Sequence, residues 1–233
     1  MSGYGSLLPG RSGKIEQLVL VRHGETVGNS SVRYHGRTDV VLSELGSAQI
    51  RAAAQWLEAA GLRHFAPVFT SPLKRAIESA RIIAGERTAL IEIDDFAEVD
   101  FGIFEGLTAE EIQLCHPAEF ALWNRDRLAA DYAYPGGESR RAFTARVERG
   151  VTTMLASLDE ASAPAGPRRC TDVRDLRVAV LVVAHRGVIR TIMRRLAGVE
   201  PHIELASIQI LQRSQGLPHW SATLDLTAHL AHL

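Results

Sequence analysis

Residues 18–26 read LVLVRHGET, and this stretch decides how the rest of the chain is interpreted. Its first four residues are all apolar, which is typical of a strand buried on both faces of a sheet. The run ends abruptly at Arg22 and His23, and Gly24 then allows the backbone to approach a ligand closely. Ligands of open α/β sheets bind outside the carboxyl ends of the strands. The stretch therefore predicts a buried strand that carries an arginine and a histidine to a binding edge.

A second stretch repeats this arrangement much later in the chain. Residues 181–187 read LVVAHRG, so that His185 and Arg186 follow the most apolar run of the sequence. We expect this run, residues 176–184, to be the central strand of the sheet. Two histidines at the carboxyl ends of two strands predict a single site that contains both.

The remaining segments alternate between strand and helix patterns. Strands are predicted over 16–22, 67–70, 89–93, 176–184, 205–213 and 219–226. One helix is predicted from the N-cap Ser43 to Ala60, and a second begins with Ser71 as N-cap and Pro72 at the first helical position. Two further helices are predicted, one that starts at Ser139 and one over 187–197. This order predicts an α/β fold with a mostly parallel central sheet and helices on both faces. We expect one domain over 15–233, in which residues 94–138 form a partial helical lid over the carboxyl edge, and a flexible tail over 1–14.

Composition excludes several classes of function. The 233 residues carry a formal net charge of -1, so the chain lacks the overall basic field of a nucleic-acid binder. No apolar run approaches the ~20 residues that span a bilayer, and we expect no membrane partner. The two cysteines form no Cys-x-x-Cys pattern, which favours a reduced, cytoplasmic setting without disulfides.

Arg22 and His23 suit phosphoryl chemistry. A neutral imidazole nitrogen attacks phosphorus readily, and the covalent intermediate divides one difficult displacement into two easier ones. A guanidinium matches phosphate oxygens with two parallel hydrogen bonds. The alternative is an arginine–histidine pair held at a strand end by surface hydrogen bonds.

Arg75 and His185 are candidates for the same site. Arg75 falls in the first turn of a predicted helix, where the helix dipole disfavours a cation, and a bound phosphate would remove that conflict. His185 could donate a hydrogen bond to the transferring phosphoryl group. The alternatives are a solvated arginine and a core histidine with satisfied hydrogen bonds.

Residues 98–106 read EVDFGIFEG and place carboxylates between aromatic residues on a glycine-punctuated loop. A carboxyl group in a partly apolar site can act as a proton donor to a leaving group. We take Glu98 as the candidate, and the alternative is a turn with solvated acids.

The four patterns, in this order, resemble the histidine phosphatase superfamily, also called phosphoglycerate-mutase-like, from about residue 18 to residue 213. Asn29, residues 36–39, residues 42–49 and residues 135–139 match as well. The resemblance implies a phosphorylated nucleophile at His23, a phosphate pocket of Arg22, Asn29, Arg75 and His185, and Glu98 as general acid and base. It also implies that no metal and no cofactor take part, and that the substrate is a small phosphomonoester.

The chain departs from the family pattern at Arg186, where glycine is usual, and at Ser79, where threonine is usual. We expect Arg186 to turn outward and pair with an acid. The other placement is at the pocket mouth, where it would meet a second anionic group of the substrate.

Several functions remain open at this point. Mutases of the family resemble one another in having basic and tyrosine residues after the acid/base glutamate, whereas residues 99–102 here read VDFG, which favours a phosphatase. The alternatives are a phosphoglycerate mutase, a metal-dependent hydrolase with His23 and His185 as ligands, and a non-catalytic phosphate-binding protein. The sequence identifies neither the substrate nor the oligomeric state.

Overall fold

The computed structural model describes residues 17–28, 32–161, 179–213 and 220–227, and the tail predicted over 1–14 lies outside this part. The strands of the described part are β1 (Gln17–Arg22), β2 (Phe65–Thr70), β3 (Leu90–Glu92), β4 (Ala179–Ala184), β5 (Ile208–Arg213) and β6 (Trp220–Leu226). Its α-helices are α1 (Glu44–Ala59), α2 (Lys74–Ala84), α3 (Ala109–Cys115), α4 (Pro117–Asp126), α5 (Arg140–Ala161) and α6 (Arg186–Ala197). None of these helices is both long enough and apolar enough to cross a membrane.

The strands form one sheet in the order β3-β2-β4-β1-β5-β6. The first four strands in this order run parallel, whereas β5 and β6 are antiparallel to their neighbours. The predicted α/β fold with a mostly parallel sheet is therefore confirmed. Strands β1 and β4 are adjacent at the centre, and Arg22 lies opposite Ala184 in their register. This register brings the two residues that follow, His23 and His185, side by side.

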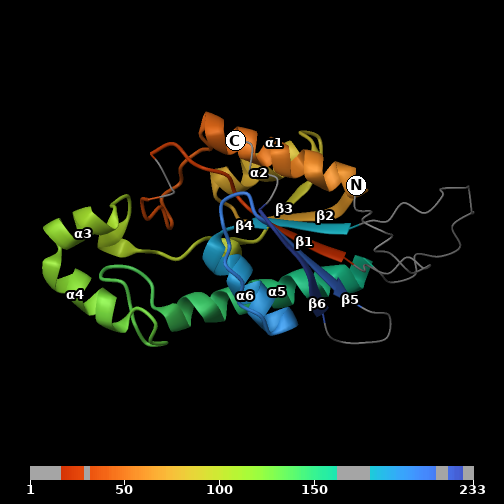
Figure 1. Ribbon diagram of the computed structural model, residues 1–233. Helices are drawn as coiled ribbons and strands as arrows, with labels where there is room; N and C mark the ends of the chain where they lie inside the picture. Colours follow the sequence, from red (N-terminus) through yellow and green to blue (C-terminus); the bar gives the residue numbers. More distant parts are fainter. Residues whose placement is uncertain (1–16, 29–31, 162–178, 214–219, 228–233) are drawn as a thin grey trace, which may run out of the picture.

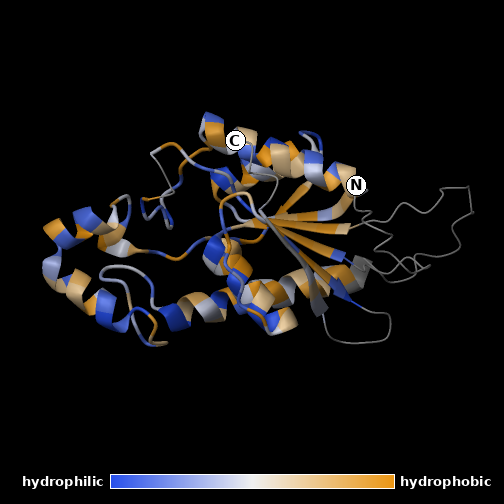
Figure 2. Cartoon of the chain, viewed as in Figure 1, coloured by the Kyte–Doolittle hydropathy of each residue, from blue (hydrophilic) through white to orange (hydrophobic). Residues whose placement is uncertain are grey.

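Each face of the sheet packs against its own helices (Figure 1). Successive side chains of a strand point to opposite faces. Leu18 and Leu20 accordingly belong to the core under α5 and α6, and Val19 and Val21 belong to the core under α1 and α2. The central strands are therefore apolar on both sides (Figure 2). The apolar runs that predicted buried strands result from this double coverage.

The helix starts differ in how well the sequence predicts them. Ser43 caps α1, and its Oγ accepts a hydrogen bond from the Gly46 N–H at 3.0 Å, as predicted. The predicted cap at Ser71 is wrong, because α2 begins at Lys74 after the N-cap residue Leu73. The Ser71 hydroxyl lies 2.7 Å from Nε2 of His185 and also accepts from the Leu73 N–H at 3.3 Å, so it connects the segment before α2 to the site.

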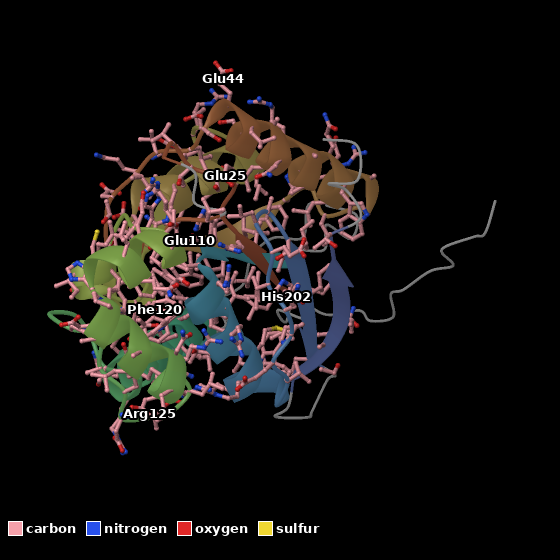
Figure 3. The ribbon with its side chains drawn as sticks, turned by 60° about the vertical axis from the view of Figure 1, so that its left-hand side comes forward. Glu25, Glu44, Glu110, Phe120, Arg125 and His202 are labelled. Atoms are coloured by element: carbon pink, nitrogen blue, oxygen red, sulfur yellow. The ribbon has the colours of Figure 1, made fainter. Side chains whose placement is uncertain are left out.

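The segment predicted as a lid contains two short 3₁₀ helices, η1 (Asp94–Phe96) and η2 (Gly102–Phe104), followed by α3 and α4. It has a small core of its own around Phe104, Ile112 and Trp123. Helices α3 and α4 lie beyond the end of the sheet (Figure 1), and Phe120 and Arg125 mark α4 in Figure 3. That this segment forms a partial lid over the carboxyl edge remains a prediction.

Candidate active site

A cavity of about 530 Å³ opens at the carboxyl edge of the parallel strands. It is lined by residues that end or follow these strands, namely Arg22 and His23 after β1, Arg75 after β2, Glu98 after β3, and Arg186 and Gly187 after β4. Phe101, Trp123 and Tyr134 of the segment over 94–138 also line it. Four of the residues predicted for the site thus lie around one cavity, at the edge where the sheet topology places ligands.

His23 is held rigidly at the floor of this cavity. Its side chain is buried, its N–H donates to the carbonyl of Ala184 at 3.1 Å, and its carbonyl accepts from the N–H of Ala206 at 3.1 Å. The ring atom Nδ1 lies 2.7 Å from the carbonyl oxygen of Gly24. Because a carbonyl oxygen only accepts, Nδ1 carries the proton, and in the neutral ring Nε2 keeps a free electron pair.

The protonation state of His23 suits a nucleophile. Burial lowers the pKa of His23 well below its ordinary value, and the cations Arg75 and Arg22 lower it further. The imidazole is therefore neutral at physiological pH.

Gly24 has a different role from the predicted approach to a ligand. A Cβ atom at Gly24 would lie 2.3 Å from the carbonyl oxygen of Gly46, and one at Gly46 would lie 1.9 Å from the carbonyl oxygen of Glu25. The two glycines therefore allow the turn after β1 to cross the start of α1 in direct backbone contact. This crossing fixes the turn that holds the His23 ring.

Arg75 is buried and immobilised, so the alternative of a solvated arginine is wrong. Its guanidinium donates to the carbonyls of His35 and Thr38 at 2.8 Å each and of Gly36 at 2.7 Å. Its Nε–H is buried without a hydrogen-bond partner among the described residues. This buried N–H is therefore a donor available to a bound anion.

Arg22, like Arg75, is a buried arginine whose Nε–H has no partner among the described residues. Its Nη1 donates to the carbonyl of Ile203 at 3.1 Å. Burial, with the nearby charge of Arg186, lowers the pKa of Arg22 to about 9. The guanidinium is thus still charged at neutral pH.

His185 lies behind His23 and is not among the residues that line the cavity. The two rings meet edge to face, with centroids 5.1 Å apart. Burial, followed by the charge of Arg75, lowers the pKa of His185 well below its ordinary value. Its Nε2 contacts Ser71, and its buried Nδ1 has no partner in the part of the chain that the structure describes.

Glu98 faces the cavity from the loop after η1. One carboxylate oxygen accepts from the N–H of Val99 at 3.0 Å, and the other accepts from the N–H of Gly187 at 3.2 Å. A Cβ atom at position 187 would lie 2.6 Å from the Glu98 carboxylate, so a side chain there would displace this carboxylate. Glu98 therefore bridges its own loop and the first turn of α6.

The Glu98 loop is fastened by Arg146 of α5. Arg146 donates to the carbonyl oxygens of Asp95, Ala97 and Glu98 at 2.8 to 3.0 Å, and it pairs with Glu138 at 2.8 Å. This pair is largely buried, with side-chain exposures of 10% and 16%. No sequence motif marks Arg146 for this role.

The second glutamate of the 98–106 stretch has a structural role. Glu105 accepts hydrogen bonds from the N–H groups of Arg37 at 2.9 Å, Thr38 at 3.0 Å and Phe101 at 3.0 Å. It also accepts from the Thr38 hydroxyl. Glu105 thereby orders the loop whose carbonyls hold Arg75.

The remaining sequence predictions have mixed outcomes. Asn29 lies outside the described residues. The outward ion pair expected for Arg186 is wrong, because this side chain lines the cavity and has no ion pair with any described residue. Sequence reasoning missed Tyr34, His35, Arg127 and Arg140, which also line the cavity but come from aperiodic loops and helix ends. In the described part of the chain, no three His, Cys, Asp or Glu side chains are grouped so as to hold a metal ion.

Comparisons with known proteins agree with this geometry. The model of the histidine phosphatase superfamily (branch 1) matches residues 18–223. A glucosyl-3-phosphoglycerate phosphatase of Mycobacterium tuberculosis is 35% identical over 185 residues, which are 78% of this chain and 76% of that protein. A solved structure of mycobacterial glucosyl-3-phosphoglycerate phosphatase in complex with VO3 is similar with a TM-score of 0.68 and 29% identity, over 91% of this chain and 98% of that chain.

A longer relative covers more of the chain. The bifunctional protein Rv2228c of Mycobacterium tuberculosis is 33% identical over 211 residues, which are 87% of this chain and 52% of that protein. The chain therefore spans about half the length of this relative.

Proposed function

The chain belongs to the histidine phosphatase superfamily, and from this premise we propose that it hydrolyses phosphomonoesters of small metabolites through a phosphohistidine on His23. The observation that carries the proposal is the state of His23, whose neutral ring presents a free Nε2 at a cavity that Arg22 and Arg75 also line. The relative that is 35% identical is a phosphatase, which supports the same conclusion.

In the proposed complex, the phosphoryl oxygens take up the unpartnered donors of the site. The Nε–H groups of Arg22 and Arg75 each lack a partner among the described residues. If the Ser71 hydroxyl donates to Nε2 of His185, then Nδ1 of His185 carries a proton and is a third donor. These donors stabilise the charge of the transferring phosphoryl group.

The first chemical step transfers the phosphoryl group to His23. The Nε2 electron pair forms a bond to phosphorus while the bond from phosphorus to the ester oxygen breaks. The departing oxygen takes a proton from the Glu98 carboxyl group, which leaves an alcohol and a phosphohistidine.

The second step hydrolyses the intermediate. The Glu98 carboxylate accepts a proton from a water molecule as the water oxygen forms a bond to phosphorus. The bond from phosphorus to Nε2 breaks, and its electron pair returns to the ring. Inorganic phosphate leaves, and both His23 and Glu98 regain their initial states.

A mutase would differ in this second step, because it returns the phosphoryl group to an organic hydroxyl instead of water. The proposal of a hydrolase rests on residues 99–102, which lack the basic and tyrosine residues noted for mutases, and on the phosphatase relative. A cytoplasmic location, independence from metals and the absence of a cofactor belong to the same proposal.

A panel of phosphomonoesters, assayed for inorganic phosphate in the presence of a chelator, tests this function. We expect phosphate release that persists with chelator and is inhibited by vanadate. His23→Ala should abolish release, whereas His202→Ala, which removes an exposed histidine, should retain it. Release that requires an added metal, or phosphoryl transfer to an organic acceptor without phosphate release, would contradict the proposal.

A further inference from the structure

The outer part of the cavity carries cations that have no partner of opposite charge. Arg186 and Arg140 line the cavity, and neither side chain has a hydrogen bond or ion pair with another described residue. Arg127 also lines the cavity. Among the described residues, its one side-chain hydrogen bond is a long contact of 3.4 Å with Asn124. Other arginines of the lining have carboxylate partners: Arg33 pairs with Glu111, and Arg190 and Arg194 share Glu200.

Arg186 occupies an electrostatically unfavourable position. It is the first residue of α6, where the positive end of the helix dipole repels a cation. The first turn itself contains no acidic residue, although the Glu98 carboxylate accepts from the N–H of Gly187. It also lies near the buried guanidinium of Arg22, whose pKa it lowers. An anion beside Arg186 would relieve both repulsions.

The transferring phosphoryl group does not account for this cation. Arg22 and Arg75 are buried at the floor beside His23 and retain free Nε–H groups, so they suffice to bind that group. Arg186 is instead exposed within the cavity, at the residue after the buried His185. Its long side chain is therefore available to another part of the substrate.

Arg186 and Arg127 act on the same neighbour across the cavity. Burial raises the pKa of Tyr34, and the charges of Arg127 and Arg186 both oppose this rise. The two guanidinium groups, from the end of α4 and the start of α6, thus lie near one tyrosine of the cavity wall.

We infer that Arg186, together with Arg127 and Tyr34, forms a second anion subsite, so that the preferred substrate carries an anionic group on the alcohol side of the phosphoester. The inference rests on the proposed function, since it concerns the leaving group of the same reaction. A guanidinium binds carboxylate and phosphate alike through paired charge-assisted hydrogen bonds. The class of substrate is therefore a phosphomonoester with a carboxylate or a further phosphate group.

Two matched pairs of substrates test the subsite and separate these two anions. One pair is 3-phosphoglycerate and glycerol 3-phosphate, and the other is fructose 1,6-bisphosphate and fructose 6-phosphate. For each pair, the ratio of kcat/KM for the anionic member to kcat/KM for the other member is measured in the parent and in Arg186→Gln. We expect the ratio to fall about tenfold or more in the variant for at least one pair, which is the size of one charge-assisted hydrogen bond.

Further variants separate the subsite from a general charge effect. Arg186→Lys should recover part of the ratio, and Arg127→Gln should lower it. Arg195→Gln removes the same charge from the exposed side of α6, where Arg195 contacts Glu148 and Thr152, and should leave the ratio as in the parent. A fall in the first pair alone identifies a carboxylate, and a fall in the second alone identifies a phosphate.

Ratios that stay within about twofold of the parent for both pairs in Arg186→Gln would overturn the subsite while leaving the proposed function intact. A parent protein that releases no phosphate from any of the four substrates or from p-nitrophenyl phosphate would overturn the proposed function, and the subsite with it.

Discussion

One carboxylate oxygen of Glu98 accepts a hydrogen bond from the N–H of Gly187 at 3.2 Å, across 89 residues of sequence. This contact joins the loop that follows η1 to the first turn of α6, directly after the buried His185 and the cavity residue Arg186. It holds the carboxyl group at the cavity that His23 also lines. Glu98 is thus positioned before any substrate binds, which is a condition for efficient proton transfer.

The loss of activity on replacement of Glu98 should depend on how much the leaving group needs a proton. Glu98→Gln keeps the size of the side chain but removes the transferable proton. We expect kcat/KM to fall by about 10²- to 10⁴-fold for alkyl phosphates. The loss should be much smaller for p-nitrophenyl phosphate, whose leaving group needs little help from a proton.

Glu44→Gln provides a control, because Glu44 lies in the exposed first turn of α1 (Figure 3) and is not among the residues that line the cavity. This variant should behave like the parent on both substrates. Equal losses on alkyl and p-nitrophenyl phosphates in Glu98→Gln would show that Glu98 has only a structural role.

The buried histidines should make stability depend on pH. The pKa of His23 and that of His185 both lie well below the ordinary value in the folded protein, whereas in the unfolded chain they are about 6.5. Below this pH the unfolded state takes up protons that the folded state does not. The free energy of unfolding should therefore fall as the pH drops through ~6.5, by up to about 1.4 kcal/mol per pH unit and histidine.

Urea unfolding between about pH 7 and pH 5 measures this slope. His185→Gln should have a shallower slope than the parent, and His202→Gln, at an exposed position, should keep the parent's slope. A parent whose unfolding free energy is constant over this range would contradict the neutral state of the two histidines.

Arg146 should contribute more to the free energy of unfolding than Arg149, which lies on the same helix. Both contact Asp95, but Arg146 is buried against Glu138 and three carbonyl groups, whereas Arg149 makes one ion pair with a side-chain exposure of 65%. Removal of one partner of a buried pair typically costs about 3–5 kcal/mol, and an exposed pair contributes about 0–1 kcal/mol.

Arg146→Gln should accordingly lower the free energy of unfolding by several times the loss in Arg149→Gln, as measured by urea denaturation. It should also lower kcat/KM, because the loop of Glu98 loses its attachment. Similar losses of stability in the two variants would show that the buried pair does not hold this loop.

The sheet was predictable from sequence because its central strands are buried on both faces, which leaves continuous apolar runs before His23 and His185. The helix start at Lys74 was not, since the hydroxyl of Ser71 that could cap the helix contacts His185, 114 residues away. A local pattern records no such distant partner. The Ser71 hydroxyl still accepts from the Leu73 N–H, but the helix itself begins later, at Lys74.

The site was predictable only in part. His23, Arg75 and Glu98 each end or follow a strand, so the topology brings them to one edge. The outward turn expected for Arg186 was wrong because the direction of a side chain at a helix start depends on the surrounding loops. Arg127 and Arg140 reach the cavity from the ends of α4 and α5, and no periodic pattern marks those positions.

The proposed mechanism depends most directly on a covalent phosphoryl group at His23. The measurement is a turnover mixture quenched in alkali, which preserves the bond from phosphorus to nitrogen, followed by peptide mass spectrometry of the parent and of His23→Gln. We predict one phosphoryl group on His23 in the parent and none in the variant, whose turnover should fall by several orders of magnitude. A phosphoryl group on another residue, or turnover by His23→Gln at the parent's rate, would contradict the proposed mechanism.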